Sequence, residues 1–337
     1  MIKGITSIAV SALLSACAPT STTFIASEPI PVSSSPLEER VPVQYKEGVQ
    51  RVLEIRQFAI DSLGFHKNSK HYTWFTEEQD HQHTVSLLSI TGRTTLPISR
   101  AAKAEKLHLD GLYREDIAGF LYLESEKDPL TDEQEYYNRQ GYDTYWRAVT
   151  SYHSTGEGLG SPITPDFLKS DFANQVEIAV HEMCHENVEH NIGPGFSDEL
   201  DDSFCTLVGY AARVEYFSQK NLDEKRDAAK DSFNELTAFA QKFNEIYGKL
   251  TELYRQDLPI EEKMKQRERL FAEIQPFRSM EANNASLWSW HPYLVHHSLM
   301  NEAYKAQGSV ITFVQKMKDC PEEEEQALKY IKELAKK

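Results

Sequence analysis

The pattern His-Glu-Met-Cys-His at residues 181–185 constrains the fold of this chain more than any other feature, because it prescribes both a helix and a buried face. Residues 170–190 predict a long helix, which the Gly-Pro-Gly at 193–195 ends. On a helix, residues four apart differ by about 40° around the axis, so both imidazoles point to one side. Mostly apolar residues at 176–180 precede the pattern, so we expect the leading turn to be buried.

The chemistry that suits this pattern is metal binding. Neutral imidazoles of His181 and His185 can supply two ligands of Zn²⁺, which prefers four-coordinate tetrahedral sites. Glu182 then lies beside the metal without coordinating it, where it can take a proton from a zinc-bound water. The pattern is the zinc-peptidase signature, and it predicts one Zn²⁺ per chain. Glu186 departs from the usual motif, which carries an uncharged residue at this position. The alternative to a metal site is that both histidines lie on the surface of an amphipathic helix.

A catalytic zinc site needs a third protein ligand and an open fourth position. His190 follows His185 by five residues, whereas three-histidine sites of this type use six, so His190 is not expected to bind the metal. Residues 197–210 form an acidic cluster that enters an apolar helix. A carboxylate from this second helix, packed against the first, would complete a site of two histidines and one carboxylate.

The N-terminus has the features of an export signal followed by a tether. One basic residue, Lys3, precedes an apolar run at 5–14 that is too short to cross a bilayer as a helix. The run ends in Leu-Ser-Ala-Cys at 14–17, which resembles the lipobox of bacterial lipoproteins and implies a signal peptide at 1–16 with lipidation of Cys17. The alternative is an ordinary secretory signal with an incidental cysteine. Residues 17–44 are rich in Ser, Thr and Pro and predict a flexible tether.

By the same resemblance, Ala18 after the cysteine implies a lipid anchor in the outer membrane, facing the periplasm of a Gram-negative bacterium. Folded structure is expected to begin near Tyr45, so residues 45–337 form the predicted domain. Apolar periodicity across this domain predicts several helices and strands. We expect helices at 49–63 and 133–139, strands at 71–75, 84–90, 117–123 and 143–152, and a helical hairpin with stripes at 233–253 and 260–274. The predicted fold class is therefore α+β, with a small sheet and a helical C-terminal half.

The second helix carries a more specific pattern, Asp-Asp-Ser-Phe-Cys-Thr-Leu-Val at 201–208. It resembles a family of bacterial lipoproteins described as putative aminopeptidases, related to the gluzincin zinc peptidases, whose second helix opens with Asn-Glu-Ser-Phe-Ala-Thr. The match continues at the Asn-Asn-Ala of 283–285, which the family follows with a tyrosine at the spacing of Tyr293. The resemblance spans nearly all of the mature domain and implies a gluzincin-like zinc peptidase fold.

The resemblance also implies roles for individual residues. Asp202 aligns with the family's third ligand, a glutamate; because Asp is one methylene shorter, Glu199, one turn earlier, remains an alternative. Tyr293 aligns with a donor that would hold the developing oxyanion, although an aromatic residue at a core edge is an alternative. Cys184 and Cys205 each lie within a turn of a ligand, as small buried side chains or as a disulfide.

The charge balance of the chain argues against nucleic acid as a binding partner. The chain has 52 acidic and 36 basic side chains, a net charge of −16, and a polyanion such as nucleic acid requires a basic surface instead. The predicted function is zinc-dependent hydrolysis of peptide substrates at the cell envelope, as an aminopeptidase. The alternatives are an endopeptidase of the same class and an inactive lipoprotein that binds a metal or a protein partner. The oligomeric state is left open.

Overall fold

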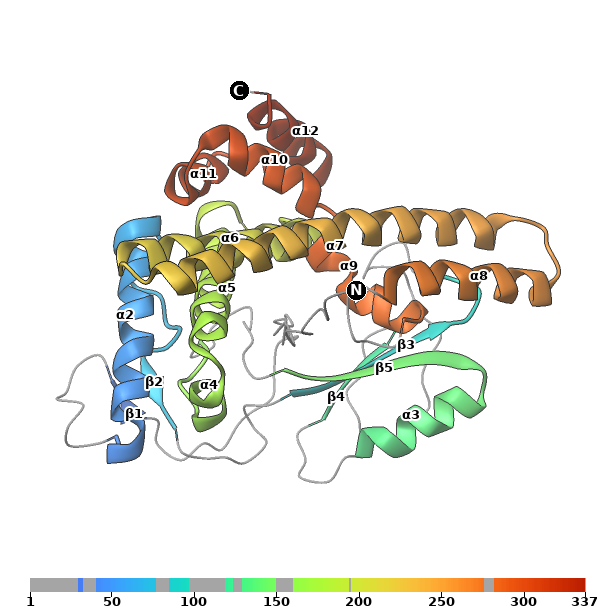
Figure 1. Cartoon of the computed structure of the whole chain (residues 1–337), viewed down its shortest axis with the longest axis horizontal. Helices are drawn as coiled ribbons and strands as arrows, with labels where there is room; N and C mark the ends of the chain where they lie inside the picture. Colours follow the sequence, from blue (N-terminus) through green and yellow to red (C-terminus); the bar gives the residue numbers. More distant parts are fainter. Residues whose placement is uncertain are drawn as a thin grey trace, which may run out of the picture.

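The computed structural model describes residues 30–32, 41–76, 85–96, 119–123, 129–149, 160–193, 195–275 and 282–336. Its strands are β1 (Ile30–Pro31), β2 (Trp74–Phe75), β3 (Val85–Gly92), β4 (Gly119–Leu123) and β5 (Tyr142–Val149). Its helices are η1 (Val43–Tyr45), α2 (Lys46–Leu63), α3 (Pro129–Arg139), α4 (Pro165–Lys169), α5 (Phe172–Asn191), α6 (Asp198–Gln219), α7 (Asp223–Arg255), α8 (Ile260–Ile274), α9 (Asn284–Leu294), α10 (His297–Gln307), α11 (Val310–Met317) and α12 (Glu324–Leu334). In Figure 1, α2 and α5 stand side by side, α7 crosses near one end of both, and the sheet lies on the other side of the molecule with α3.

The larger sheet has the antiparallel order β4-β3-β5, and a separate two-stranded sheet pairs β1 with β2. Helix α9 packs on β3 and β5, so the sheet supports a helix that approaches α6. A mostly helical chain with small antiparallel sheets confirms the α+β prediction. The strand expected at 71–75 is reduced to two residues, because Tyr72 has a φ of 57° and this left-handed conformation interrupts an extended strand.

Part of the predicted tether is packed on the domain. Residues Ile30 and Pro31 pair with Phe75 and Trp74, and the side chain of Val32 is buried. Ordered contacts therefore begin before Tyr45, where the sequence pattern predicts the domain to start. Cys17 and the predicted signal peptide lie outside the described residues.

The first long helix, α2, follows its predicted pattern. Its apolar residues at three- and four-residue steps are buried, and the helix ends at Gly64, whose φ of 73° is the left-handed conformation that terminates many helices. This buried face packs against α5, which carries the His-Glu-Met-Cys-His pattern. Helix α2 thus covers one side of the site-bearing helix.

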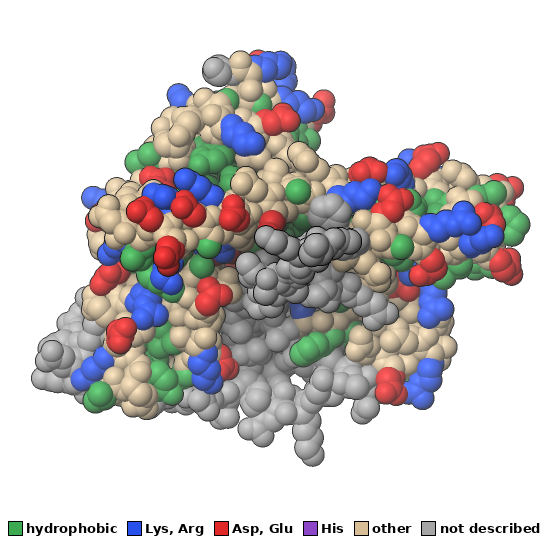
Figure 2. Space-filling view, viewed as in Figure 1, with side chains coloured by type: hydrophobic (Ala, Val, Ile, Leu, Met, Phe, Trp, Pro, Cys, Tyr) green, Lys and Arg blue, Asp and Glu red, His purple; other side chains and the backbone are tan. Residues whose placement is uncertain are grey.

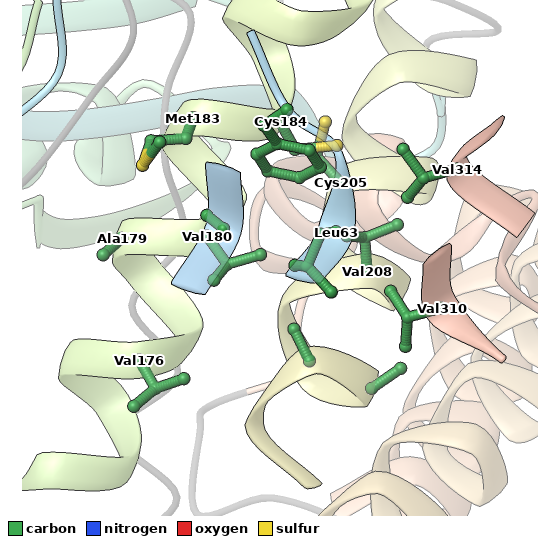
Figure 3. Close-up of a cluster of buried hydrophobic side chains, with 14 of the residues drawn as sticks. Leu63, Val176, Ala179, Val180, Met183, Cys184, Cys205, Val208, Val310 and Val314 are labelled. Atoms are coloured by element: carbon green, nitrogen blue, oxygen red, sulfur yellow. The ribbon is translucent and has the colours of Figure 1, made fainter. Parts of the chain in front are cut away.

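Helices α5 and α6 form the centre of the molecule, and both are buried along most of their length. A Cβ atom on Gly209 of α6 would lie 2.9 Å from the carbonyl oxygen of Glu177 on α5, so this glycine permits the close approach of the two backbones. Figure 3 shows the apolar contact around this pair, where Cys184 and Cys205 lie with Val208 and the valines of α11. Both cysteines are free and buried, which matches the packing interpretation.

Helices α7 and α8 form the predicted hairpin. The stripe side chains Leu236, Phe239, Phe243, Ile246, Leu250 and Leu253 of α7 are buried, together with Phe271 and Ile274 of α8. Acidic and basic side chains alternate over the outward surface of the same two helices (Figure 2). Within the described part of the chain, no helix has the length and apolar character needed to cross a membrane.

Candidate metal site

Three metal-binding side chains meet between α5 and α6. His181 and His185 lie on successive turns of α5, and Asp202 lies near the start of α6; the three are 6%, 1% and 0% exposed. The Nε2 atoms of the two histidines are 3.0 Å apart, and Asp202 Oδ1 lies 3.5 Å from Nε2 of His185. One ligand atom from each residue lies within 4.8 Å of the other two, so the group could hold a metal ion.

Each histidine also has a hydrogen-bond partner outside the group of three. Nδ1 of His185 donates to Oδ2 of Asp201 at 2.8 Å, since a carboxylate can only accept. His181 bonds the backbone of Cys205. These partners hold both rings so that the Nε2 atoms converge, which is the usual way in which outer groups orient histidine ligands.

The geometry suits a tetrahedral ion. Ligand atoms bound at about 2.0–2.2 Å to one tetrahedral zinc lie about 3.3–3.6 Å from each other. The separations of 3.0 and 3.5 Å from His185 Nε2 to the other two ligand atoms are close to this value. Two imidazoles and one carboxylate are also the donor set of catalytic zinc sites that keep a fourth position open.

The two histidines titrate in opposite directions. Burial and the neighbouring His185 lower the pKa of His181 well below its ordinary value of 6.5. Burial also disfavours charge on His185, but the charge and hydrogen bond of Asp201, reinforced by two further carboxylates, outweigh it and raise this pKa to about 10. Without a metal, His185 is therefore a positively charged imidazolium at neutral pH, with a proton on both ring nitrogens. A metal ion must displace the Nε2 proton in order to bind that atom.

Two further predicted residues lie beside the group. Glu182 follows His181 on α5 and is fully buried, and its charge acts on His185. Tyr293 lies on α9, is also fully buried, and has its ring centroid 6.2 Å from that of His181. The structure thus brings the predicted general base and the predicted oxyanion donor to the same place.

The position of α9 follows from the Asn-Asn-Ala pattern. Asn283 caps the helix by accepting from the backbone of Ser286, and its side chain donates to the carbonyl of Thr144 on β5. Asn284 donates to the carbonyls of Gly92 and Thr95 at the end of β3. The two asparagines therefore fasten the start of α9 to the sheet.

Helix α6 holds the other end of α9. Ser203, next to Asp202, donates to the carbonyl of Pro292 at 2.6 Å and accepts from the backbone N–H of His296. Ser203 thus links the neighbourhood of Asp202, a candidate metal ligand, to Pro292, which directly precedes Tyr293. The Ser-Phe pattern of the sequence thus connects two parts of the site.

The remaining candidates lie elsewhere. Glu199 belongs to neither metal-binding group found among the described residues, and its charge acts on Tyr247 and His296 instead. His190, on the outer end of α5, stacks on the ring of His66 with centroids 3.9 Å apart. Glu186, the departure from the usual motif, accepts from the backbone N–H of Lys70 at 3.1 and 3.2 Å.

Sequence reasoning missed two residues near the site. Asp201 directly precedes Asp202, and the signal was the cluster of acids at the start of α6, in which adjacent residues point about 100° apart. Arg147 on β5 contacts Tyr293, and its signal was alternation, because Asp143, Tyr145 and Arg147 share one face of a strand. Neither residue stands out without knowledge of which elements pack together.

Comparison with known proteins identifies the family of this chain. The chain matches the family described as "Putative aminopeptidase" over residues 125–334, which is more than half of its length, and it belongs to that family. The match covers α5, α6 and α9, and hence every residue of the candidate site discussed above. No curated protein matches the chain, and no solved structure matches it.

Proposed function

We propose that this protein is a zinc-dependent aminopeptidase of the gluzincin type. The observation that carries the proposal is the convergence of His181 Nε2, His185 Nε2 and the Asp202 carboxylate in a buried group, with Glu182 beside them. Membership of the aminopeptidase family supplies the substrate class, since it points to peptides. The donor set and spacing favour zinc among the metals that such residues bind.

Each residue of the proposed site would have its own role in peptide hydrolysis. His181, His185 and Asp202 would hold the metal, and a bound zinc would polarise the scissile carbonyl and make water more acidic. Glu182, buried and negatively charged in the active form, would accept a proton from the attacking water and later pass it to the leaving amine. Tyr293 would donate a hydrogen bond to the oxygen that gains negative charge.

The proposed location rests on the N-terminal sequence alone. We propose that Cys17 is lipidated and that the following segment links the domain to the outer membrane on its periplasmic side. Because β1 pairs with β2, the usable tether ends before Ile30 and spans about a dozen residues. Such a tether would keep the domain close to the membrane surface.

The decisive experiment compares the chain from Ala18 onward with its Glu182→Gln variant. Starting at Ala18 keeps β1, which a start at Tyr45 would remove. We expect one zinc per chain in both proteins by elemental analysis. Hydrolysis of aminoacyl amides should fall by about 10²–10⁴-fold in the variant, which is the usual contribution of a general base.

Other outcomes would change the proposal. Zinc binding without turnover of any aminoacyl amide or internally quenched peptide would support a non-catalytic metal-binding lipoprotein. Cleavage confined to internal bonds of long peptides would identify an endopeptidase. Loss of zinc in Glu182→Gln would show that this residue is a ligand instead of a base.

A further inference from the structure

The buried arginines of the described chain differ in how their charge is compensated. Arg213 on α6 donates to Glu177 at 2.8 Å, and Arg267 on α8 forms an ion pair with Asp143. Arg147 on β5 is 9% exposed, and no carboxylate of the described chain pairs with it. Of these three arginines, Arg147 is therefore the one whose charge no carboxylate of the described residues compensates.

Most of the hydrogen-bonding capacity of Arg147 is also unused. Nη2 donates to the hydroxyl of Tyr293 at 3.4 Å, which is a long contact, while Nε and Nη1 are buried without a partner. A guanidinium carries five N–H groups, and leaving them buried and unpaired costs free energy. Among the described residues, its partners are thus the hydroxyl and the ring of Tyr293, and neither is a carboxylate. A buried guanidinium without a carboxylate beside it suits an acidic group of a bound molecule.

The guanidinium lies close to the candidate metal site. Its Cζ atom lies 5.5 Å from the ring centroid of Tyr293, and the Tyr293 ring centroid lies 6.2 Å from that of His181. The arginine and His181, a candidate metal ligand, are thus both neighbours of the same aromatic ring. Arg147 belongs to β5 and Tyr293 to α9, and these two elements pack against each other.

We propose that Arg147 binds a carboxylate group of the peptide substrate, so that the site selects peptides with a negative charge next to the scissile bond. This inference rests on the proposed peptidase function and adds a substrate class to it. A planar guanidinium forms two parallel hydrogen bonds with a carboxylate, which a neutral amide cannot match in strength. The carboxylates of Glu182, Asp201 and Asp202 would otherwise repel an acidic substrate, and Arg147 offsets that repulsion.

The carboxylate could belong to an acidic side chain or to the free C-terminus of a very short peptide, and paired ligands distinguish these sources. The protein is the zinc-loaded Glu182→Gln chain from Ala18 onward, in which binding is measured by calorimetry without turnover. The first pair is Ala-Ala and Ala-Ala-amide; the second is Glu-Ala-amide and Gln-Ala-amide. At least one acidic member should bind ten-fold or more tightly than its neutral partner.

Two variants in the same background test the residue. Arg147→Gln should reduce the acid preference to within about two-fold, mainly by weakening the acidic peptides. Arg139→Gln removes an exposed arginine at the end of α3 and should keep the preference in full. Because Arg147 has no ion pair with any described residue, the thermal midpoint of Arg147→Gln should equal or exceed that of its parent.

Several results would overturn the inference. It fails if neither acidic peptide is preferred, or if Arg147→Gln keeps the preference. It also fails if Arg147→Gln lowers the thermal midpoint and weakens acidic and neutral peptides equally, because that would show a structural role. If Arg147→Gln does not fold, Arg147→Lys, which keeps the charge, must lose part of the preference. Since no turnover is required, an absence of hydrolysis in the native chain would count against the peptidase function alone.

Discussion

The helix pair α5–α6 and the helical hairpin α7–α8 bury different kinds of side chain. The pair encloses two histidines, three carboxylates and a thiol pair among its apolar contacts. The hairpin buries an apolar stripe and places most of its charges on the outside, where ion pairs such as Lys242 with Glu273 link α7 to α8. Its buried arginine, Arg267, is paired with Asp143. The hairpin thus gains stability mainly from apolar burial, whereas the pair has buried charged groups that a metal ion would neutralise.

This difference separates stability from function within one domain. Buried charges are costly unless they are paired or bind a metal, so a chain retains them where chemistry requires them. An amphipathic hairpin has no such requirement, and its apolar stripe supports the α9 face that carries Tyr293. Changes in the hairpin should therefore affect unfolding, and changes in the pair should affect metal binding.

The largest expected effect is on the hairpin. Leu250→Ala removes a fully buried side chain of α7 and should lower the free energy of unfolding by about 2–5 kcal/mol. Urea unfolding with zinc present measures this change, and zinc stoichiometry should remain one per chain. Lys249→Ala, at the neighbouring exposed position, is the matched control and should change little. A loss of zinc in Leu250→Ala would contradict the separation.

The next effect concerns the third ligand. Asp202→Asn replaces a charged ligand with a weak neutral one. Removing a residue that only orients a ligand lowers metal affinity by up to roughly 100-fold, and the loss of this ligand should lower zinc affinity by more. Competition with a chromogenic chelator measures the affinity. Glu199→Gln, on the same turn region of α6, should leave it unchanged. Full affinity in Asp202→Asn with loss in Glu199→Gln would move the ligand to Glu199.

A smaller effect is expected from the residue that orients His185. Asp201→Ala removes the acceptor of the His185 Nδ1 proton and should lower zinc affinity by about 10–100-fold. Asp201→Asn keeps an acceptor without the charge and should lose less. The same chelator competition distinguishes them. Equal affinity in all three proteins would show that the hydrogen bond does not orient the ligand.

The smallest effect is a dependence on pH. The folded pKa of His185 is about 10, above its ordinary value of 6.5, so the metal-free protein holds a proton that zinc must displace. Zinc affinity should thus rise about tenfold per pH unit between pH 6.5 and 9, with release of about one proton. Calorimetry in buffers of different ionisation enthalpy measures that release. In the metal-free chain, the stabilisation from this proton is complete below pH 6.5 and is lost as the pH rises through 10.

The sequence alone determined those features that depend on local spacing. The four-residue step from His181 to His185 places both rings on one side of any α-helix, whatever surrounds it. The apolar stripe of α7 likewise predicts a buried face, because its period matches the helix. The resemblance in the second helix pointed to Asp202 by register, without any knowledge of packing.

Only the tertiary structure decided which distant residues meet. Asp201 reaches His185 because Gly209 lets α5 and α6 approach closely, and Arg147 reaches Tyr293 because two asparagines fix α9 to the sheet. These contacts join residues up to 146 positions apart, and no local pattern encodes them. Spacing along a helix is set by backbone geometry, whereas the partners of a buried charge are set by how separate elements pack.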